Sequence, residues 1–185
     1  NGGIWQPGDV IQAAIGQSDN AFTPLQLATY CATIANNGTR LKTHLVKQVT
    51  NYNRDQVISE TEPEVVAQVD ISEENLKTVQ EAMKGVTQSG GTANSVFGDY
   101  GITIAAKTGT AENPGHSDNV TFIAYAPYDD PEIAVAVVLE YGSRGTYSMN
   151  VAKDIFDAYF YGKTVDENGN LVMPEETNSS STANE

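Results

Sequence analysis

A short segment near the middle of the chain carries residue types that acyl-transfer chemistry uses. It reads Lys107-Thr108-Gly109-Thr110-Ala111-Glu112 and directly follows an alternating pattern that is typical of a β-strand. A lysine in such a place attracts the anionic end of a ligand and lowers the pKa of acidic groups beside it. Because Gly109 has no side chain, an extended substrate can lie alongside the strand as an added β-strand. The segment therefore predicts half of an acyl-transfer site.

The backbone of this segment has a specific expected role. The N–H of Thr110 can donate to a carbonyl oxygen as it becomes an oxyanion, a contribution worth roughly 3–4 kcal/mol in comparable sites. Thr108 and Thr110 alternate with Gly109, so we expect their hydroxyls on a common side of the strand. The alternative interpretation is an ordinary strand that ends in a polar turn, and this segment alone leaves it open.

Composition limits the classes of protein to consider. The chain has 185 residues, of which 39% are hydrophobic, enough for one domain with a core. Its formal net charge of −14 argues against binding to nucleic acid or anionic lipid.

The single cysteine, Cys31, excludes an internal disulfide and a cysteine-rich metal site, and its apolar surroundings predict a buried thiol. The longest apolar run, 133–139, is too short to cross a bilayer.

Two helices have clear start signals. Thr23, Pro24 and Gln26 form the pattern of a capping box with proline at the first helical position. This helix ends at Asn36-Asn37-Gly38. A second helix begins after Ser72, and its apolar stripe runs to Val86 before Gly90-Gly91.

The second half of the chain predicts a small sheet. Strands are expected over 102–107, 120–126 and 133–140, and the turn at 127–131 makes the last two antiparallel. The last strand is apolar at nearly every position, so both its faces should be covered. A final helix over 149–161 covers one face of the sheet. A minor hairpin is expected from 45–49 and 56–58. From about Lys163 to Glu185 the chain is polar, and we expect a disordered tail there.

Several segments together resemble the C-terminal part of the transpeptidase domain of class B penicillin-binding proteins, within the penicillin-recognising serine enzymes. The similarity spans about Trp5 to Tyr161 and places the partial domain at 1–162. The segments that carry it are Ala14-Ile15-Gly16-Gln17, Thr23-Pro24-Leu25-Gln26-Leu27-Ala28, Ile34-Ala35-Asn36-Asn37-Gly38, Leu45-Val46, Gly91-Thr92-Ala93, Lys107 to Glu112, and Phe122 to Pro127.

This resemblance implies a fold and a set of roles. The fold would be α+β, with an antiparallel sheet flanked by helices. Lys107 and Thr110 would be catalytic, Lys107 in the proton network and Thr110 as an oxyanion donor. Thr108, Gly109 and Thr110 would bind substrate, the two threonines holding the carboxylate of a peptidoglycan stem peptide or of a β-lactam. The reaction would be D,D-transpeptidation through an acyl-enzyme, with no metal and no organic cofactor.

The nucleophile that the resemblance requires is missing from the sequence. No Ser-x-x-Lys occurs, so we expect the isolated chain to be inactive and its partner to be the N-terminal part of the same domain. Two Ser-x-Asn triplets occur, Ser18-Asp19-Asn20 and Ser117-Asp118-Asn119. The first lies in a loop where the family does not keep its motif, and the second follows the lysine strand in the wrong order. We therefore interpret both as structural, and Ser18 as part of a turn.

Two other functions stay open. One is a β-lactam-sensing receptor domain of the same fold, although Thr23 to Ala28 favours the transpeptidase. The other is a non-catalytic fragment that acts only with a partner chain. The resemblance also implies a parent protein that is anchored in the membrane outside this segment, lies outside the cytoplasm, and works with a cell-wall glycosyltransferase. We further expect an isolated chain to expose apolar surface along the last strand and the terminal helix.

Overall fold

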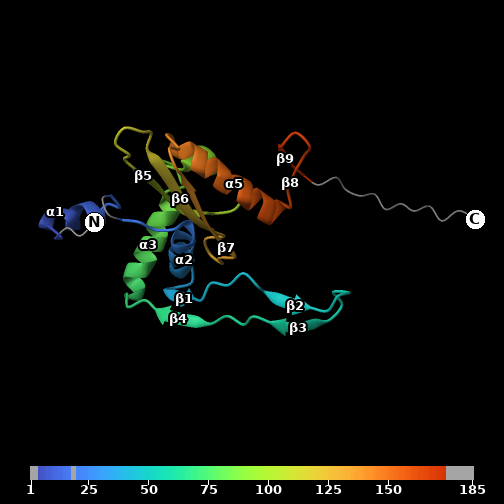
Figure 1. Ribbon diagram of the computed structural model, residues 1–185. Helices are drawn as coiled ribbons and strands as arrows, with labels where there is room; N and C mark the ends of the chain where they lie inside the picture. Colours follow the sequence, from blue (N-terminus) through green and yellow to red (C-terminus); the bar gives the residue numbers. More distant parts are fainter. Residues whose placement is uncertain (1–3, 18–19, 174–185) are drawn as a thin grey trace, which may run out of the picture.

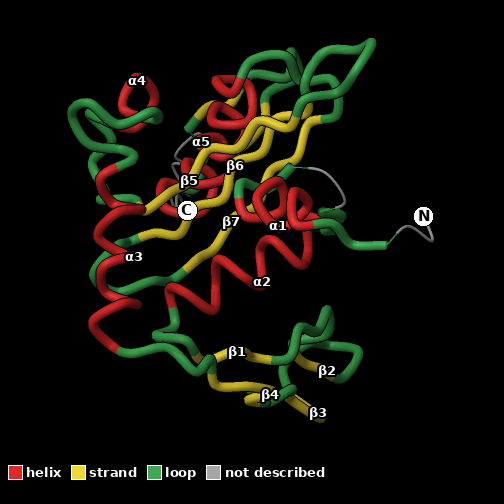
Figure 2. The backbone as a smooth tube through the Cα atoms, turned by 90° about the vertical axis from the view of Figure 1, so that its left-hand side faces the viewer, coloured by secondary structure: helices red, strands yellow, loops and turns green. Residues whose placement is uncertain are grey.

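A three-stranded antiparallel sheet forms the centre of the molecule. The computed structural model describes residues 4–17 and 20–173. Strands β5 (Ala105–Ala111), β6 (Asn119–Ala126) and β7 (Ile133–Leu139) lie in the order β5-β6-β7. Helix α5 covers one face, and helices α2 and α3 lie against the other (Figures 1 and 2). The predicted antiparallel sheet flanked by helices is confirmed.

The alternation of side chains along the strands divides the interior into two cores. On the α5 side, Phe97, Phe122 and Phe156 pack together, each at most 4% exposed. On the other side, Tyr125 packs with residues of α2 and α3, Cys31 among them. Burial raises the pKa of the Cys31 thiol to about 12, so this cysteine is a core residue, as its surroundings predict. The two cores fix the sheet between its helices.

The predicted helix starts are confirmed by their caps. Helix α2 (Pro24–Ala35) begins at a capping box in which Thr23 and Gln26 bond each other's backbone N–H groups. The Ser72 hydroxyl accepts from the backbone of Asn75 at the start of α3 (Glu73–Gly85). Helix α5 (Gly145–Tyr161) begins four residues before the predicted start and ends at Gly162, whose φ of 66° is left-handed.

Two strands differ from expectation, one in its extent and the other in its burial. The lysine strand was predicted over 102–107, but β5 begins only at Ala105 and keeps pairing with β6 as far as Ala111 opposite Asn119. The whole Lys-Thr-Gly segment is therefore inside the strand. Strand β7 has α2 against one face and α5 against the other, as predicted, but only Val135 and Val137 are buried, each 6% exposed.

The first half of the chain also forms an arm that projects from this body (Figure 1). Strand β1 (Thr39–Leu41) pairs with β4 (Val65–Gln68), and β2 (Gln48–Thr50) pairs with β3 (Val57–Glu60). The second pair is the predicted hairpin. Short elements complete the fold: helices α1 (Pro7–Ala14) and α4 (Asn94–Phe97), and strands β8 (Thr164–Val165) and β9 (Leu171–Val172).

The strands β8 and β9 form a hairpin within the segment predicted to be a disordered tail. The rest of that tail, 174–185, lies outside the described residues. In the described parts of the chain, no helix has the length and apolar character required to cross a bilayer.

Candidate active site

The Lys-Thr-Gly segment lies on an edge strand. Strand β5 is at one end of the sheet, and within residues 4–17 and 20–173 no strand pairs with its outer edge. Two hydrogen bonds orient its backbone. The carbonyl of Thr103 accepts at 2.9 Å from the N–H of Tyr128, a residue that lies just past the end of β6. The carbonyl of the next residue, Ile104, points the other way and accepts from Thr87 Oγ1 at 2.7 Å. Odd-numbered residues of this strand therefore direct their backbone groups toward β6.

The backbone groups of the even-numbered residues face the open edge, because they alternate along an antiparallel strand. The N–H and C=O of both Thr108 and Thr110 thus point away from β6. This direction leaves the Thr110 N–H available to a molecule that lies along β5.

Lys107 brings a positive charge to the same edge. Its side chain is exposed, and its Nζ donates to the carbonyl oxygen of Thr108 at 2.7 Å. The ammonium therefore lies beside the open edge and in contact with solvent, not in the packed interior. A cation and a backbone N–H that faces away from the sheet, on one strand edge, can hold an anionic group and an oxyanion at neighbouring positions.

The two faces of β5 supply different groups at this edge. Lys107 shares its face with Ala105, which packs toward α2 and α3. Thr108 and Thr110 share the other face with Ala106, which packs toward α5. The predicted common side of the two threonines follows from this register. A ligand along the edge would have the ammonium on one side and the hydroxyls on the other.

The structure shows a reason for glycine at position 109 that the sequence did not reveal. A Cβ atom at this position would lie 2.8 Å from Thr121 Oγ1, on the residue that Gly109 faces across the β5–β6 pair. A side chain here would need Thr121 to move. Close packing within the sheet therefore favours glycine, in addition to any approach of a ligand.

A third threonine at the site was not predicted from the sequence. Thr92 lies in the turn after α3, and its Oγ1 is 3.1 Å from Thr108 Oγ1. The two residues are 16 positions apart in sequence. The family resemblance includes Gly91-Thr92-Ala93, but nothing in these three residues alone indicates a contact with β5.

The Ser-x-Asn triplet after β5 has structural contacts. The Asp118 carbonyl accepts from Ser143 N at 3.1 Å, and Asn119 Oδ1 accepts from Tyr141 N at 2.9 Å. These bonds tie the loop after β7 to the start of β6. In the other triplet, Ser18 and Asp19 lie outside the described residues. In the described part of the chain, no cluster of three or more His, Cys, Asp or Glu side chains could hold a metal ion.

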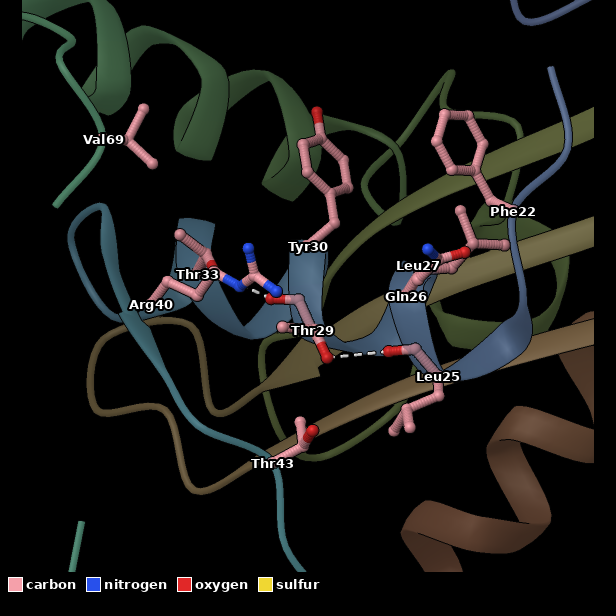
Figure 3. Close-up of a pocket in the computed structure, with 10 residues that line it drawn as sticks. All are labelled: Phe22, Leu25, Gln26, Leu27, Thr29, Tyr30, Thr33, Arg40, Thr43 and Val69. Carbon is pink, nitrogen blue, oxygen red and sulfur yellow. Dashed lines mark hydrogen bonds between the residues drawn. The ribbon is translucent and has the colours of Figure 1, made fainter. Parts of the chain in front are cut away.

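A cavity of about 530 Å³ lies elsewhere, between α2 and the arm (Figure 3). It is mostly apolar, and Phe22, Leu25 and Tyr30 line it together with Arg40. None of the residues of β5 lines this cavity. This cavity and the Lys-Thr-Gly edge are thus separate places.

The resemblance to penicillin-recognising serine enzymes implies an antiparallel sheet with helices on both faces. The structure has this sheet, and the Lys-Thr-Gly segment lies along its open edge. Residues 1–160 match the family described as the penicillin binding protein transpeptidase domain. The chain belongs to this family.

Individual relatives agree with this assignment. The chain is 37% identical over 172 residues to penicillin-binding protein 2A of Bacillus subtilis, covering 83% of this chain and 24% of the relative. It is 30% identical to the peptidoglycan D,D-transpeptidase MrdA of Haemophilus influenzae, covering 84% of this chain and 26% of the relative.

A solved structure has the same fold. The imipenem acyl-enzyme complex of penicillin-binding protein A from M. tuberculosis superposes with a TM-score of 0.69 at 30% identity, covering 80% of this chain and 33% of that one. The chain spans about a quarter of the length of the two curated relatives, 24% of the first and 26% of the second.

Proposed function

We propose that this chain is the C-terminal part of a peptidoglycan D,D-transpeptidase of the class B penicillin-binding type. It supplies the Lys-Thr-Gly strand and one oxyanion donor, and the serine nucleophile comes from another part of the protein. The observation that carries the proposal is the position of the Lys107 ammonium on the open edge of β5, the edge that the Thr110 N–H faces. Membership of the family and a relative named as a D,D-transpeptidase support it.

In the proposed reaction, a stem peptide lies along the open edge of β5 as an added strand. The serine attacks a carbonyl carbon near the end of this peptide, and the Thr110 N–H donates to the oxygen that becomes negative. The bond to the terminal residue then breaks, which leaves an acyl-enzyme. An amine of a second stem peptide attacks the acyl group, forms the cross-link and releases the serine.

Three residues have binding or proton-handling roles in this scheme. Lys107 helps to move the serine proton and attracts the substrate carboxylate, because its ammonium lies at the edge where that carboxylate would bind. Thr108 and Thr110 donate their hydroxyl hydrogens to the same carboxylate. A β-lactam would occupy the same edge with its own carboxylate. The imipenem acyl-enzyme complex of the M. tuberculosis relative supports this part of the proposal.

The proposal includes the setting of the parent protein. The transpeptidase domain would lie outside the cytoplasm and be anchored in the membrane by a part of the protein other than this chain. Its partners would be the remainder of the domain, the stem peptide and a cell-wall glycosyltransferase.

The test is acylation by a fluorescent penicillin in a full-length protein that contains this chain. We expect the unaltered protein to be labelled and Lys107→Ala to abolish labelling. Lys47→Ala is the matched control, since it removes an exposed charge from the arm and should leave labelling unchanged. Unchanged labelling of Lys107→Ala would refute the role of that ammonium.

The same reagent tests where the nucleophile lies. We expect the isolated 185-residue chain to form no covalent adduct, as measured by intact mass. A stable adduct on this chain would show that a nucleophile lies within it.

A further inference from the structure

The hydroxyl pair of Thr92 and Thr108 joins the turn after α3 to the Lys-Thr-Gly strand. Their Oγ1 atoms are 3.1 Å apart. Thr108 is half-buried, and Thr92 is exposed beside it. The pair therefore lies on the surface, next to the open edge of β5.

The turn that carries Thr92 has little freedom. A Cβ atom on Gly91 would lie 2.2 Å from the carbonyl oxygen of Val86 and 2.4 Å from that of Gly85, so only glycine fits against the end of α3. On the other side, Ala93 is fully buried, and its N–H donates to the same Val86 oxygen at 2.9 Å. Thr92 is thus held between two residues that are packed against fixed backbone.

The chemistry of two hydroxyls in contact determines what such a pair does beside an anion. A hydroxyl has one hydrogen to donate and two lone pairs that accept, whereas a carboxylate only accepts. If Thr108 donates its hydrogen to a carboxylate, its oxygen can accept from the Thr92 hydroxyl. Each bond in such a chain polarises the next and strengthens it.

We propose that Thr92 is a positioning residue, which donates to Thr108 Oγ1 and thereby directs the Thr108 hydrogen toward the carboxylate of the substrate or β-lactam. This inference rests on the proposed function and names a residue outside the Lys-Thr-Gly segment that sets recognition of the carboxylate. Thr92 acts through Thr108 and does not touch the reacting atoms.

The test compares two penicillins in a full-length protein that contains this chain. One carries the free carboxylate, and the other is its methyl ester. In Thr92→Val, which keeps the shape and loses the hydroxyl, we expect the acylation rate with the free acid to fall about tenfold, the upper end of the scale for a lost hydrogen bond between neutral groups. The rate with the ester should change little, so the ratio of the two rates falls about tenfold.

Four further variants separate positioning from a general structural effect. Thr92→Ser retains the hydroxyl and should keep the ratio of the unaltered protein. Thr78→Val replaces an exposed threonine on α3 and should also keep it. The double variant Thr92→Val/Thr108→Val should have the same ratio as Thr108→Val alone, because the first residue acts through the second.

The outcomes are distinct. If the unaltered protein is not acylated by the free acid, the proposed function fails and this inference fails with it. If it is acylated and Thr92→Val leaves the ratio unchanged, the inference alone is overturned. A loss of folded protein in Thr92→Val lowers both rates equally and leaves their ratio readable, so partial unfolding cannot imitate the expected result.

Discussion

Gly109 and Thr121 share a small space between β5 and β6. The two residues face each other in the antiparallel register, and Thr121 Oγ1 fills the space where a side chain on Gly109 would begin. The glycine of the Lys-Thr-Gly segment is therefore part of the packing of the sheet. A substitution at either Gly109 or Thr121 should therefore change this packing.

We expect Gly109→Ala to destabilise the transpeptidase domain by about 1–3 kcal/mol, the usual cost of an added group in a packed site. The new Cβ would meet Thr121 Oγ1 at 2.8 Å unless that side chain turns. The measurement is the melting temperature of a full-length protein that contains this chain.

The matched rescue is Gly109→Ala/Thr121→Ala. Removal of the threonine hydroxyl opens the space, so the double variant should melt at a higher temperature than Gly109→Ala. If Gly109→Ala melts at the temperature of the unaltered protein, Thr121 does not restrict this position.

Helix α5 is anchored near its C-terminus by a buried carboxylate. Asp157 is 3% exposed. Its oxygens accept from Lys153 Nζ at 2.8 Å, from Lys163 Nζ at 2.7 Å and from the Tyr100 hydroxyl at 2.9 Å. Burial by itself would raise the pKa of Asp157, but these three donors outweigh it and hold the pKa below its usual value. The network ties α5 to the loop that precedes β5.

Asp157→Asn should therefore lower stability at neutral pH by about 1.5–3 kcal/mol, the range for hydrogen bonds to a charged group. A carboxyl whose pKa is lower in the folded protein contributes stability above its unfolded pKa, about 3.9, and loses this contribution as the pH falls through the folded pKa. The difference in melting temperature between the two proteins should thus be largest at pH 7 and shrink below pH about 4.

Asp154→Asn is the control for this experiment, because it removes the same charge from an exposed position one turn earlier in α5. We expect it to change stability by less than about 0.5 kcal/mol. A stability loss in Asp157→Asn that stays constant from pH 7 to pH 3 would contradict the account of the lowered pKa.

Elements whose signals are local were predicted well from the sequence. The capping box at Thr23 and Gln26 and the cap at Ser72 depend on residues three apart, and both are present. The alternation of the strands also gave the two faces of β5. The extension of β5 to Ala111 was missed because it depends on pairing with Asn119, across a loop whose composition is polar.

Prediction of the candidate site from the sequence had the same limit, because contacts between distant positions were missed. The Lys107 segment was predicted as a site from its own residues and their order, and this stays a prediction that its position on an open edge supports. The contact of Thr92 with Thr108 and the restriction of Gly109 by Thr121 both join distant positions. Such contacts follow from how the elements pack, which no pattern within one segment specifies.

The molecule as a whole leaves apolar surface uncovered. Along α5, four exposed residues at intervals of four form one stripe, the α5 stripe: Tyr147, Val151, Ile155 and Tyr159, which are 52, 41, 38 and 51% exposed. Strand β7 is at the second end of the sheet, and five of its seven residues are only partly buried. The predicted apolar exposure along the terminal helix is confirmed, and that along the last strand is present in part.

An apolar stripe and an open apolar strand edge favour association between chains. The net charge of −14 opposes this, because every copy repels the next. Salt screens that repulsion beyond a distance of about 8–10 Å but does not weaken the burial of apolar surface. The balance of the two effects is therefore set by ionic strength.

We expect the isolated 185-residue chain to sediment as species larger than a monomer, and the fraction of these species to rise between low and physiological salt. Val151→Gln/Ile155→Gln makes the middle of the α5 stripe polar and should shift the distribution toward the monomer. The control is Val57→Gln/Ile58→Gln, which replaces the same two residue types at exposed positions on β3 and should leave association unchanged. A monodisperse monomer at every salt concentration would show that neither the α5 stripe nor the β7 edge drives contact between copies.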